Sequence, residues 1–562
     1  MRTAPSISPP DFATADTLAP LVAPLAARAR SFMDLNRTSA TYGCADRPYW
    51  YYRTLTNFSG STWQQVMLGL AALYRTEHPA NPFAGSEEVL EAASAALGYW
   101  ARIAHRDGAF DEWYLNEFSY CPTAITGAGA ALTLDLLGDK LAPEVRGLAS
   151  DALCRTAGWL QSRYNPTVMN QNLAAAVALA GAARIDPKWE AVAEARLARV
   201  RKDQSPEGWF PEYSGSDLGY STLALDLLAA YDRLAGGEAR AMAAGLTTFL
   251  TDVQGGWRSL GGRLGSRGTS HVFPFGALYF AAQDANAAQL AGSWMDGLSS
   301  VAASKPASID DRYFAYFYFP QFALAYQQAA QGSPPAIQGG PAQGVVDQAG
   351  SGLLAIRRGA WSALISRRLG GAIALDGGYD APIYQLGYEI DTIGGRFSSA
   401  NWDEDLTCAA LADGVVVAES QFRASSSGVP LKRLMAPFQL VVGFLGTSRL
   451  AEGFQGLIKK KMIAPKSEPG LRLQRRISLG DKGLRVHDTL TPRAGLPTIK
   501  RLDVARTISM HSPSARQDAA RNVELPEAAL AAAVAALNAG KPATLSFAID
   551  GVTGAVSMEP GN

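Results

Sequence analysis

Two glycine-rich segments of the chain carry residue types that are suited to moving protons. Residues 207–220, EGWFPEYSGSDLGY, contain Tyr213 and Tyr220 and lead into an apolar stretch. Residues 261–271, GGRLGSRGTSH, contain Arg263, Arg267 and His271, one of five histidines in the chain. Tyrosine and histidine side chains can remove a carbon-bound proton and can protonate a leaving oxygen. These are the two proton transfers that eliminative cleavage of an acidic sugar polymer requires.

A third segment combines aromatic rings with carboxylates. Residues 106–121, RDGAFDEWYLNEFSYC, include Trp113, Tyr114 and Glu117 ahead of another apolar run. Such rings can stack on sugar faces while acids accept hydrogen bonds from sugar hydroxyls, but an ordinary loop with its rings packed inward explains the same residues. The acids also fit a different reaction, hydrolysis by two carboxylates, for which the candidates are Asp111, Glu112, Glu117, Glu212 and Asp217.

Amide side chains open a fourth segment, residues 169–180, MNQNLAAAVALA. Asn170 stands where an asparagine commonly caps the helix that follows. Asn170 and Gln171 can also donate hydrogen bonds to a substrate carboxylate, and for Asn170 this role is compatible with capping.

The elements that must position these residues fall into two halves. From residue 15 to about 330, apolar residues recur at helical spacing in about a dozen amphipathic segments, which predicts a ring or solenoid of paired helices. A stretch rich in Pro, Gly and Gln follows at 331–344. We therefore predict a helical domain over 1–332, a linker over 333–345 and an antiparallel β-sandwich over 346–562. The strands are expected at 352–359, 361–368, 372–378, 414–420, 438–446, 471–480 and 484–492.

The composition excludes several classes of protein. The chain has 562 residues, of which 48% are hydrophobic, and its 51 basic residues balance 51 acidic residues. A chain without net charge has no global field for nucleic acid, and no apolar window is long enough for membrane insertion. The N-terminus lacks the features of a secretory signal, so a cytoplasmic location is expected, or a periplasmic one if a leader has been removed. The four cysteines, Cys44, Cys121, Cys154 and Cys408, are too scattered to suggest a metal site.

The motifs in the helical half resemble those of the heparinase II/III-like polysaccharide lyases and their alginate-lyase relatives. Asn170 matches an asparagine at a helix start in that family, but Gln171 stands where the family usually has a histidine. An amide can donate a hydrogen bond but cannot act as a base. Tyr220 is the better match for the family's tyrosine, with Tyr213 as its rival, and residues 263–271 resemble the loop that brings a basic residue and a histidine to the substrate.

This resemblance implies an α+β multidomain fold, in which an N-terminal (α/α) incomplete toroid of about a dozen helices is followed by a C-terminal antiparallel β-sandwich. It also implies β-elimination on an acidic polysaccharide or oligosaccharide that contains uronic acid. Tyr220, His271 and Asn170 are the expected catalytic residues, with either His271 or Tyr220 as the base. The expected substrate-binding residues are Gln171, Arg263, Arg267, Tyr213, Glu212, Trp113, Tyr114 and Glu117.

No cofactor is expected. Relatives sometimes hold a metal ion in the sandwich, but the sequence assigns no ligands for one. Two alternatives remain open at this point: a toroid glycoside hydrolase that uses paired carboxylates, and a non-catalytic protein of glycan binding or exopolysaccharide assembly.

Overall fold

The computed structural model describes residues 13–52, 57–254, 262–298, 309–332, 343–377, 381–403, 406, 411, 413–425, 435–444, 468–508 and 521–559. The helical half consists, in chain order, of α1 (Ala13–Ser31), α2 (Arg47–Trp50), the 3-10 helix η1 (Ser61–Gln65), α3 (Val66–Tyr74), α4 (Glu87–Ile103), α5 (Tyr120–Leu137), α6 (Pro143–Gln161), α7 (Met169–Ala183), η2 (Pro187–Trp189), α8 (Glu190–Lys202), α9 (Leu218–Ala235), α10 (Ala239–Gln254), η3 (Gly262–Leu264), α11 (Phe275–Phe280), α12 (Ala285–Leu298), α13 (Asp311–Tyr313), the π-helical turn η5 (Phe314–Tyr318) and α14 (Phe319–Ala329).

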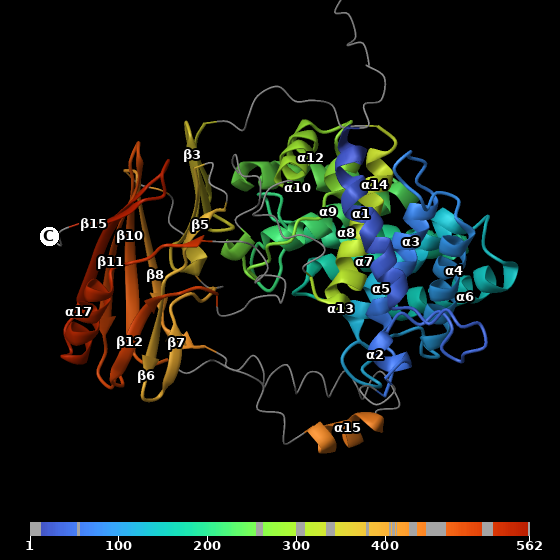
Figure 1. The fold of residues 1–562 in the computed structure, drawn as a ribbon, viewed down its shortest axis with the longest axis horizontal. Helices are drawn as coiled ribbons and strands as arrows, with labels where there is room; N and C mark the ends of the chain where they lie inside the picture. The colour runs from blue at the N-terminus through green and yellow to red at the C-terminus, as the bar shows by residue number, and fades with distance from the viewer. Residues whose placement is uncertain are drawn as a thin grey trace, which may run out of the picture.

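These helices form an inner ring with an outer layer (Figure 1). Helices α3, α5, α7, α9, α11 and α14 each contact the next, and α14 contacts α3. The other layer consists of α1, α4, α6, α8, α10 and α12, each packed against one or more inner helices or the neighbouring outer helix. Helices α5 and α7 are buried almost all round, as their nearly continuous apolar sequences require, whereas α4 and α8 expose a polar face.

The alternation between inner and outer helices gives the ring two different ends. Because an outer helix returns the chain after each inner helix, the inner helices run in the same direction. The segments that precede them therefore meet at one end of the ring. All four motif segments identified in the sequence lie in front of inner helices or at their first turns, at 106–121, 169–180, 207–220 and 261–271.

The C-terminal half contains three sheets. The six-stranded sheet has the order β1 (Gly344–Gln348), β2 (Leu353–Arg358), β3 (Trp361–Ser366), β4 (Ala372–Asp376), β5 (Ile383–Gln385) and β13 (Arg521–Asn522). The five-stranded sheet has the order β15 (Val556–Met558), β14 (Ala543–Asp550), β11 (Gly483–Pro492), β10 (Leu471–Leu479) and β8 (Val415–Gln421), and the four-stranded sheet the order β12 (Ile499–Val504), β6 (Tyr388–Thr392), β7 (Gly395–Ser398) and β9 (Arg423–Ala424). Pairing is antiparallel apart from β13 with β5, and the remaining elements are η6 (Arg367–Leu369), α15 (Met435–Gly443) and α17 (Glu527–Asn538).

The structure confirms the predicted fold class, a helical ring followed by antiparallel sheets. The expected strand at 438–446 is wrong, because α15 covers Met435–Gly443. A short apolar run of this kind does not by itself distinguish a strand from a helix. The predicted linker at 333–345 falls mostly outside the described residues, and the division into domains stays a prediction. None of the described helices combines the length and the apolar character that crossing a bilayer would need.

The six-stranded sheet joins the two halves because both of its faces are buried. Leu353 and Ala355 of β2 belong to the core of the helical ring, whereas Leu354 and Ile356 belong to the core shared with the other sheets. Strands buried on both faces are apolar at successive positions instead of alternating, which is the pattern of residues 353–356. Figure 1 shows this sheet, with β3 and β5 labelled, between the helices and the remaining strands.

A buried ion pair links this sheet to the five-stranded one. Arg475 of β10 lies opposite Asp488 of β11 and donates two hydrogen bonds to its carboxylate, at 2.8 and 2.7 Å. Both side chains are fully buried. The Tyr388 hydroxyl donates to the same carboxylate, and Arg475 also donates to the carbonyl oxygen of Gly371, at 3.2 Å.

We expect Arg475→Met to lower the free energy of unfolding by about 3–5 kcal/mol, because it leaves the Asp488 charge buried without its cation. Arg485→Met is the matched control, since Arg485 lies on the adjacent strand, is exposed and pairs with Glu559 on the surface. Exposed pairs contribute about 0–1 kcal/mol. Chemical denaturation of the two variants and the wild type measures the difference, and similar values for both variants would contradict a structural role for the buried pair.

Candidate functional site

The motif segments meet at the end of the ring where the inner helices begin. Asn170 in the first turn of α7 contacts Glu212 from the segment before α9. Tyr220 in the first turn of α9 contacts His271 from the segment before α11, with ring centroids 5.2 Å apart. Residues that are distant in sequence thus form one cluster.

Asn170 is held by Glu212. The Oε1 atom of Glu212 accepts hydrogen bonds from the backbone N–H of Asn170 at 3.1 Å and from its side-chain Nδ2 at 2.6 Å. Asn170 is the second residue of α7 and does not cap it, because Val168 occupies the N-cap position. Glu212 is 2% exposed and Asn170 is 4% exposed, and contact of Glu212 with substrate stays a prediction. Its role here is to orient the Asn170 amide.

The Glu212 carboxyl group has an unusual affinity for its proton. Burial raises its pKa to about 8, the hydrogen bonds from Asn170 act in the opposite direction, and the charge of Asp217 raises it further. Among the described residues, no group hydrogen-bonds to its second oxygen, Oε2, which is also buried. A neutral carboxyl group at this position avoids placing an uncompensated charge in the protein interior.

A tight turn presents Tyr213 to the outside. Tyr213 and Ser214 have positive φ angles of 52° and 68°, and the Glu212 N–H donates to the carbonyl oxygen of Gly215. The guanidinium of Arg267 lies over the Tyr213 ring, 4.3 Å from its centroid. A cation held on an exposed ring gives this part of the cluster both a positive charge and an aromatic surface.

Asp217 ties the two glycine-rich segments together. Its buried carboxylate accepts from the N–H groups of Tyr220 and Arg267, both at 3.0 Å, and from the Thr269 hydroxyl. The first of these bonds caps α9. Gly219 is required at this contact, since a Cβ atom there would lie 2.2 Å from the hydroxyl oxygen of Thr269.

Tyr220 and His271 differ in accessibility. Tyr220 is half-buried and has a side-chain hydrogen bond with Tyr313. Burial raises the pKa of Tyr220 well above 10, and the charge of Arg267 lowers it. His271 is buried, stacks on Phe273 at 4.7 Å and lies edge-on to Tyr220. Burial lowers the pKa of His271 to about 3, so its imidazole is neutral near pH 7.

Gln171 and Arg263, two of the expected substrate-binding residues, contact other side chains or backbone groups of this chain. Gln171 accepts a hydrogen bond from Asn165 at 2.8 Å through its side-chain oxygen. Arg263 lies toward the C-terminal half, where it donates to the carbonyl oxygen of Arg506 and sits 5.2 Å from the centroid of Tyr384. Arg267 is therefore the arginine of this segment that joins the cluster around Tyr213 and Tyr220.

The carboxylates at 111–117 hold their own loop. Asp111 accepts from the N–H groups of Asn116 and Phe118, and Glu117 accepts from those of Glu112 and Trp113. Burial raises the pKa of Glu117 to about 7. These contacts account for the acids structurally, which weakens the expectation that Glu117 contacts a sugar.

The aromatic residues of this loop lie in different environments. Trp113 is exposed, with the guanidinium of Arg312 3.9 Å from its ring centroid. Tyr114 is buried and packs edge-on against Phe438 of α15, at 5.1 Å. Of the two predicted sugar-binding rings, Trp113 is available at the surface and Tyr114 instead anchors α15 to the loop.

Sequence reasoning missed Arg312 and Tyr313 of the short helix α13. Arg312 donates to Glu112 at 2.6 Å, and Tyr313 bonds to Tyr220. The available signal was the sequence DDRY at 310–313, in which Asp310 caps the helix by accepting from the Tyr313 N–H. That signal indicates a helix start and says nothing about which neighbours the helix meets.

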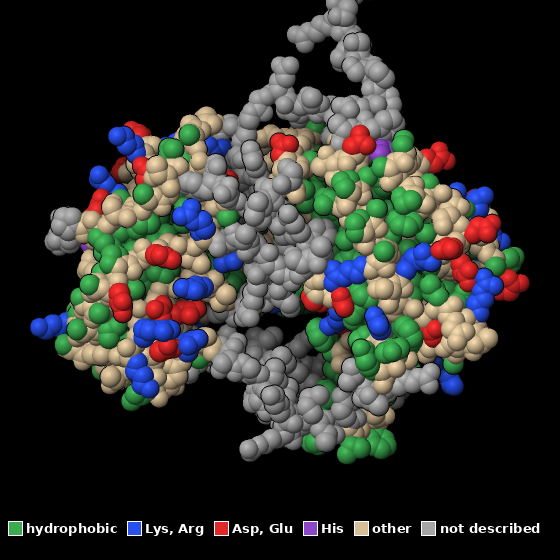
Figure 2. Space-filling model, in the orientation of Figure 1, with side chains coloured by type: hydrophobic (Ala, Val, Ile, Leu, Met, Phe, Trp, Pro, Cys, Tyr) green, Lys and Arg blue, Asp and Glu red, His purple; other side chains and the backbone are tan. Residues whose placement is uncertain are grey.

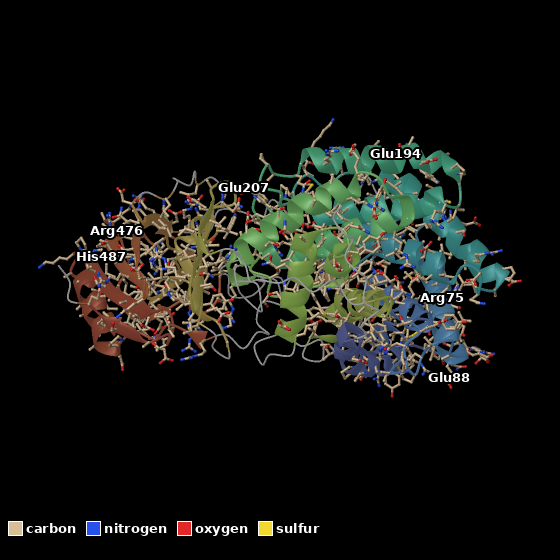
Figure 3. The ribbon with its side chains drawn as sticks, turned by 90° about the horizontal axis from the view of Figure 1, so that it is seen from above. Arg75, Glu88, Glu194, Glu207, Arg476 and His487 are labelled. Atoms are coloured by element: carbon tan, nitrogen blue, oxygen red, sulfur yellow. The ribbon has the colours of Figure 1, made fainter. Side chains whose placement is uncertain are left out.

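The C-terminal half contributes to the same region. Trp402 packs directly on Gly215, where a Cβ atom would lie 2.1 Å from its ring. The carboxylate of Glu207 accepts from the N–H groups of Gly350 and Ser351, in the turn between β1 and β2. Figure 3 shows Glu207 where the helices meet the sheets, and Arg476 and His487 well away from the helices. The described residues include no group of three His, Cys, Asp or Glu side chains placed to hold a metal ion.

No protein-family model matches the sequence, and no curated protein matches it. Among solved structures, the chain is similar to the Streptomyces coelicolor A3 chondroitin AC lyase in complex with chondroitin sulphate, with 13% identity and a TM-score of 0.46 over 90% of this chain and 69% of that one. It is also similar to a Paenibacillus xanthan lyase, with 10% identity and a TM-score of 0.47 over 87% of this chain. The alignment spans 46% of that lyase. Similarity at this level does not extend to function, which has to be inferred from the residues of the site.

We expect Glu212→Gln to change how stability depends on pH. Because the pKa of Glu212 is raised in the folded state, its protonated form contributes stability that is complete below about pH 4.5 and is lost as the pH rises through about 8. Glutamine keeps an oxygen for Asn170 but cannot ionise. The difference between the melting temperature of Glu212→Gln and that of the wild type should therefore increase from about pH 5 to about pH 9, roughly the span of these two pKa values.

The exposed Glu194 of α8, labelled in Figure 3, provides the control, because Glu194→Gln should give a constant difference across this range. The Asp217 and Arg267 charges near Glu212 are present in all three proteins and cancel in the comparison. Parallel curves for wild type and Glu212→Gln would contradict a proton held by Glu212.

Proposed function

We propose that the protein cleaves a polysaccharide or oligosaccharide containing uronic acid by β-elimination. The observation that carries the proposal is the cluster formed by Tyr220, Arg267 and Asn170, a phenol, a guanidinium and an oriented amide at one end of the ring. Asn170 and Arg267 suit the charge that develops in the reaction, and Tyr220 suits its proton transfers.

The first requirement is tolerance of the charge that develops beside the uronate carboxylate when C5 loses its proton. Donors that are already in place where this charge develops stabilise the transition state more than mobile groups do. Asn170 keeps a second N–H after donating one to Glu212. Together with the Arg267 guanidinium, it can offset the carboxylate charge. Gln171 can add its amide N–H groups to this task, because the hydrogen bond from Asn165 goes to its side-chain oxygen.

The second requirement is proton transfer at C5 and at the departing oxygen on C4. Tyr220 is half-buried, whereas His271 is enclosed by aromatic rings, so we assign contact with the substrate to Tyr220. In its phenolate form, which burial disfavours and the charge of Arg267 favours, Tyr220 takes the C5 proton. The C4–O bond then breaks as the C4–C5 double bond forms, and the phenol returns the proton to the leaving oxygen. One residue can act as both base and acid where the C5 hydrogen and the C4 oxygen lie on the same face of the sugar ring. His271 then supports the Tyr220 ring.

The third requirement is a hold on the sugar chain. Trp113 and Tyr213 present exposed rings, and a basic guanidinium lies over each of them. Rings suit the apolar faces of sugars, and the two arginines suit their carboxylates. The alternative of hydrolysis by paired carboxylates has less support, because Asp111, Glu117, Glu212 and Asp217 accept hydrogen bonds from the protein itself.

The direct test is the ultraviolet absorbance of the unsaturated product. We expect it to rise with at least one of alginate, glucuronan, heparan, hyaluronan, chondroitin sulphate or a bacterial exopolysaccharide. Tyr220→Phe should lower kcat/KM by about 100-fold or more, the usual contribution of a general acid–base group. Tyr231→Phe, about three turns later on the same helix and buried in its core, should retain activity. Full activity in Tyr220→Phe would show that the assignment is wrong, and new reducing ends without absorbance would favour hydrolysis.

A second prediction concerns Arg267. Its positive charge favours the Tyr220 phenolate, so Arg267→Gln should raise the pKa of Tyr220 and move the rising limb of the kcat/KM profile to higher pH. Arg267→Lys keeps the charge and should leave that limb close to its original position. Because the pKa of Tyr220 lies well above the ordinary value of about 10, steady-state kinetics between about pH 6 and pH 11 would follow the lower part of the limb, and its displacement appears as a lower kcat/KM at each pH. An identical limb in Arg267→Gln and Arg267→Lys would contradict electrostatic support of Tyr220.

A further inference from the structure

The exposed aromatic side chains of the described residues gather at one end of the helical ring. They are Trp113 (66% exposed), Tyr51 (58%), Tyr52 (53%), Tyr213 (38%) and Phe444 (83%). Tyr51 and Tyr52, Trp113, and Tyr213 lie on the segments in front of α3, α5 and α9. Phe444 directly follows α15, which contacts the segment before α5. The described part of the opposite end of the ring has no exposed aromatic residue.

Tyr51 and Tyr52 are adjacent rings that the function proposed above does not use. Their centroids lie 5.0 Å apart with the ring planes at 89°, and Tyr51 is also edge-on to Trp50 at 5.6 Å. The Arg47 guanidinium lies 5.3 Å from the Tyr51 centroid. The Trp50 indole N–H donates to the carbonyl oxygen of Phe32 at 2.6 Å, which fixes this short helix to the ring. The pair is thus a supported aromatic surface, although both rings remain more than half exposed.

Two hydrogen bonds, joined by short stretches of the chain, connect this pair to the candidate site. Asp46 caps α2, which ends just before Tyr51, and its carboxylate also accepts from the Gly60 N–H at 2.8 Å. The next residue, Ser61, donates through its hydroxyl to the carbonyl oxygen of Asp111 at 3.0 Å. Asp111 begins the loop that carries Trp113. Figure 1 draws α2, α13 and α15 at the same end of the ring, and Figure 2 shows hydrophobic side chains on the surface where Figure 1 draws α15.

We propose that Tyr51 and Tyr52 form a distal subsite that binds further sugar units of the same acidic polysaccharide, beyond the units held at Trp113 and Tyr213. This inference rests on the proposed function and extends it, since a subsite away from the bond that is cleaved is of use with a long chain. Exposed rings favour a sugar over a wholly apolar partner, because a sugar offers C–H faces to the rings and keeps its hydroxyls in water. The guanidinium at Tyr51 matches the acidic groups of the same chain.

Chain length is the variable that tests this subsite. We would measure kcat and KM for the wild type and for Tyr51→Ala/Tyr52→Ala on size-fractionated oligosaccharides of a polymer that the wild type cleaves. The shortest fragments should be unaffected. For the polymer, KM should rise about tenfold while kcat stays unchanged, because the lost contact binds the ground state and the transition state equally. Ile185→Ala, an exposed apolar residue just beyond the end of α7, is the control and should change neither constant.

A binding measurement separates this inference from the proposed function. Calorimetry would use the polymers of the activity panel and their size-fractionated oligosaccharides. It would compare the affinity of Tyr220→Phe with that of the variant that also carries Tyr51→Ala and Tyr52→Ala, so that cleavage does not interfere. Polymer binding that weakens about tenfold without Tyr51 and Tyr52 supports the subsite, even if no polymer is cleaved and the lyase proposal fails. Three results would contradict the subsite. They are an equal loss of affinity at all chain lengths of the sugar, no loss of affinity at any chain length, and no binding of any polymer.

Discussion

The candidate site depends on the hydrogen bonds that the buried carboxylate of Asp217 accepts. This carboxylate caps α9, which fixes the position of Tyr220, and it also binds the backbone of Arg267 and the hydroxyl of Thr269. One buried side chain therefore sets the distance between the segments that supply the phenol and the guanidinium. A buried carboxylate is stable there because several donors meet it, and each removes part of the cost of leaving water. The acid in the middle of the motif thus has a structural task, and the catalytic role proposed for Tyr220 depends on the position that this acid gives it.

The ring and the sheet provide the frame for that site. Alternation of inner and outer helices brings the segments before the inner helices to one end, whatever their separation in the sequence. The six-stranded sheet then fixes the C-terminal half to the helices, since each of its faces belongs to a different core. Through this arrangement, Trp402 reaches Gly215 and the backbone at Gly350 reaches Glu207. The segment from 207 to 220 is therefore held by both halves of the protein.

Burial determines which groups of the cluster carry charge. Glu212 holds its proton to about pH 8, His271 is neutral and Tyr220 is a phenol, because each lies in surroundings that disfavour the charged form. Arg267 supplies the positive charge among them. The cluster also holds the buried carboxylate of Asp217, whose charge is met by its own hydrogen-bond donors. The Arg267 guanidinium suits an anionic ligand, and the exposed rings around it give such a ligand an extended surface.

The sequence by itself determined that a helical half precedes a half of antiparallel sheets, and it supplied the candidate site segments, whose chemical roles stay predictions. Apolar residues at helical spacing up to about residue 330, and short apolar runs after it, were sufficient for a helical ring followed by antiparallel sheets. The apolar run at 438–446 was misassigned, because periodicity over so few residues fits a helix equally well. Residue types and glycine content also identified Tyr213, Tyr220 and Arg267. Local patterns of this kind depend on neighbours along the chain, and a sequence displays those directly.

Only the tertiary structure decided what each side chain contacts. In the structure, Glu212 accepts a hydrogen bond from Asn170, and Arg263 lies at the junction with the sheets. His271 packs in a buried aromatic cluster. The structure also added Arg312 and Tyr313, whose short helix has no distinctive motif, and it gathered the exposed rings at one end. Most of these outcomes depend on contacts between residues 42 to 243 positions apart and on how much water each group retains. Neither quantity is written in the local sequence, because both arise when the ring closes and the sheet packs against it.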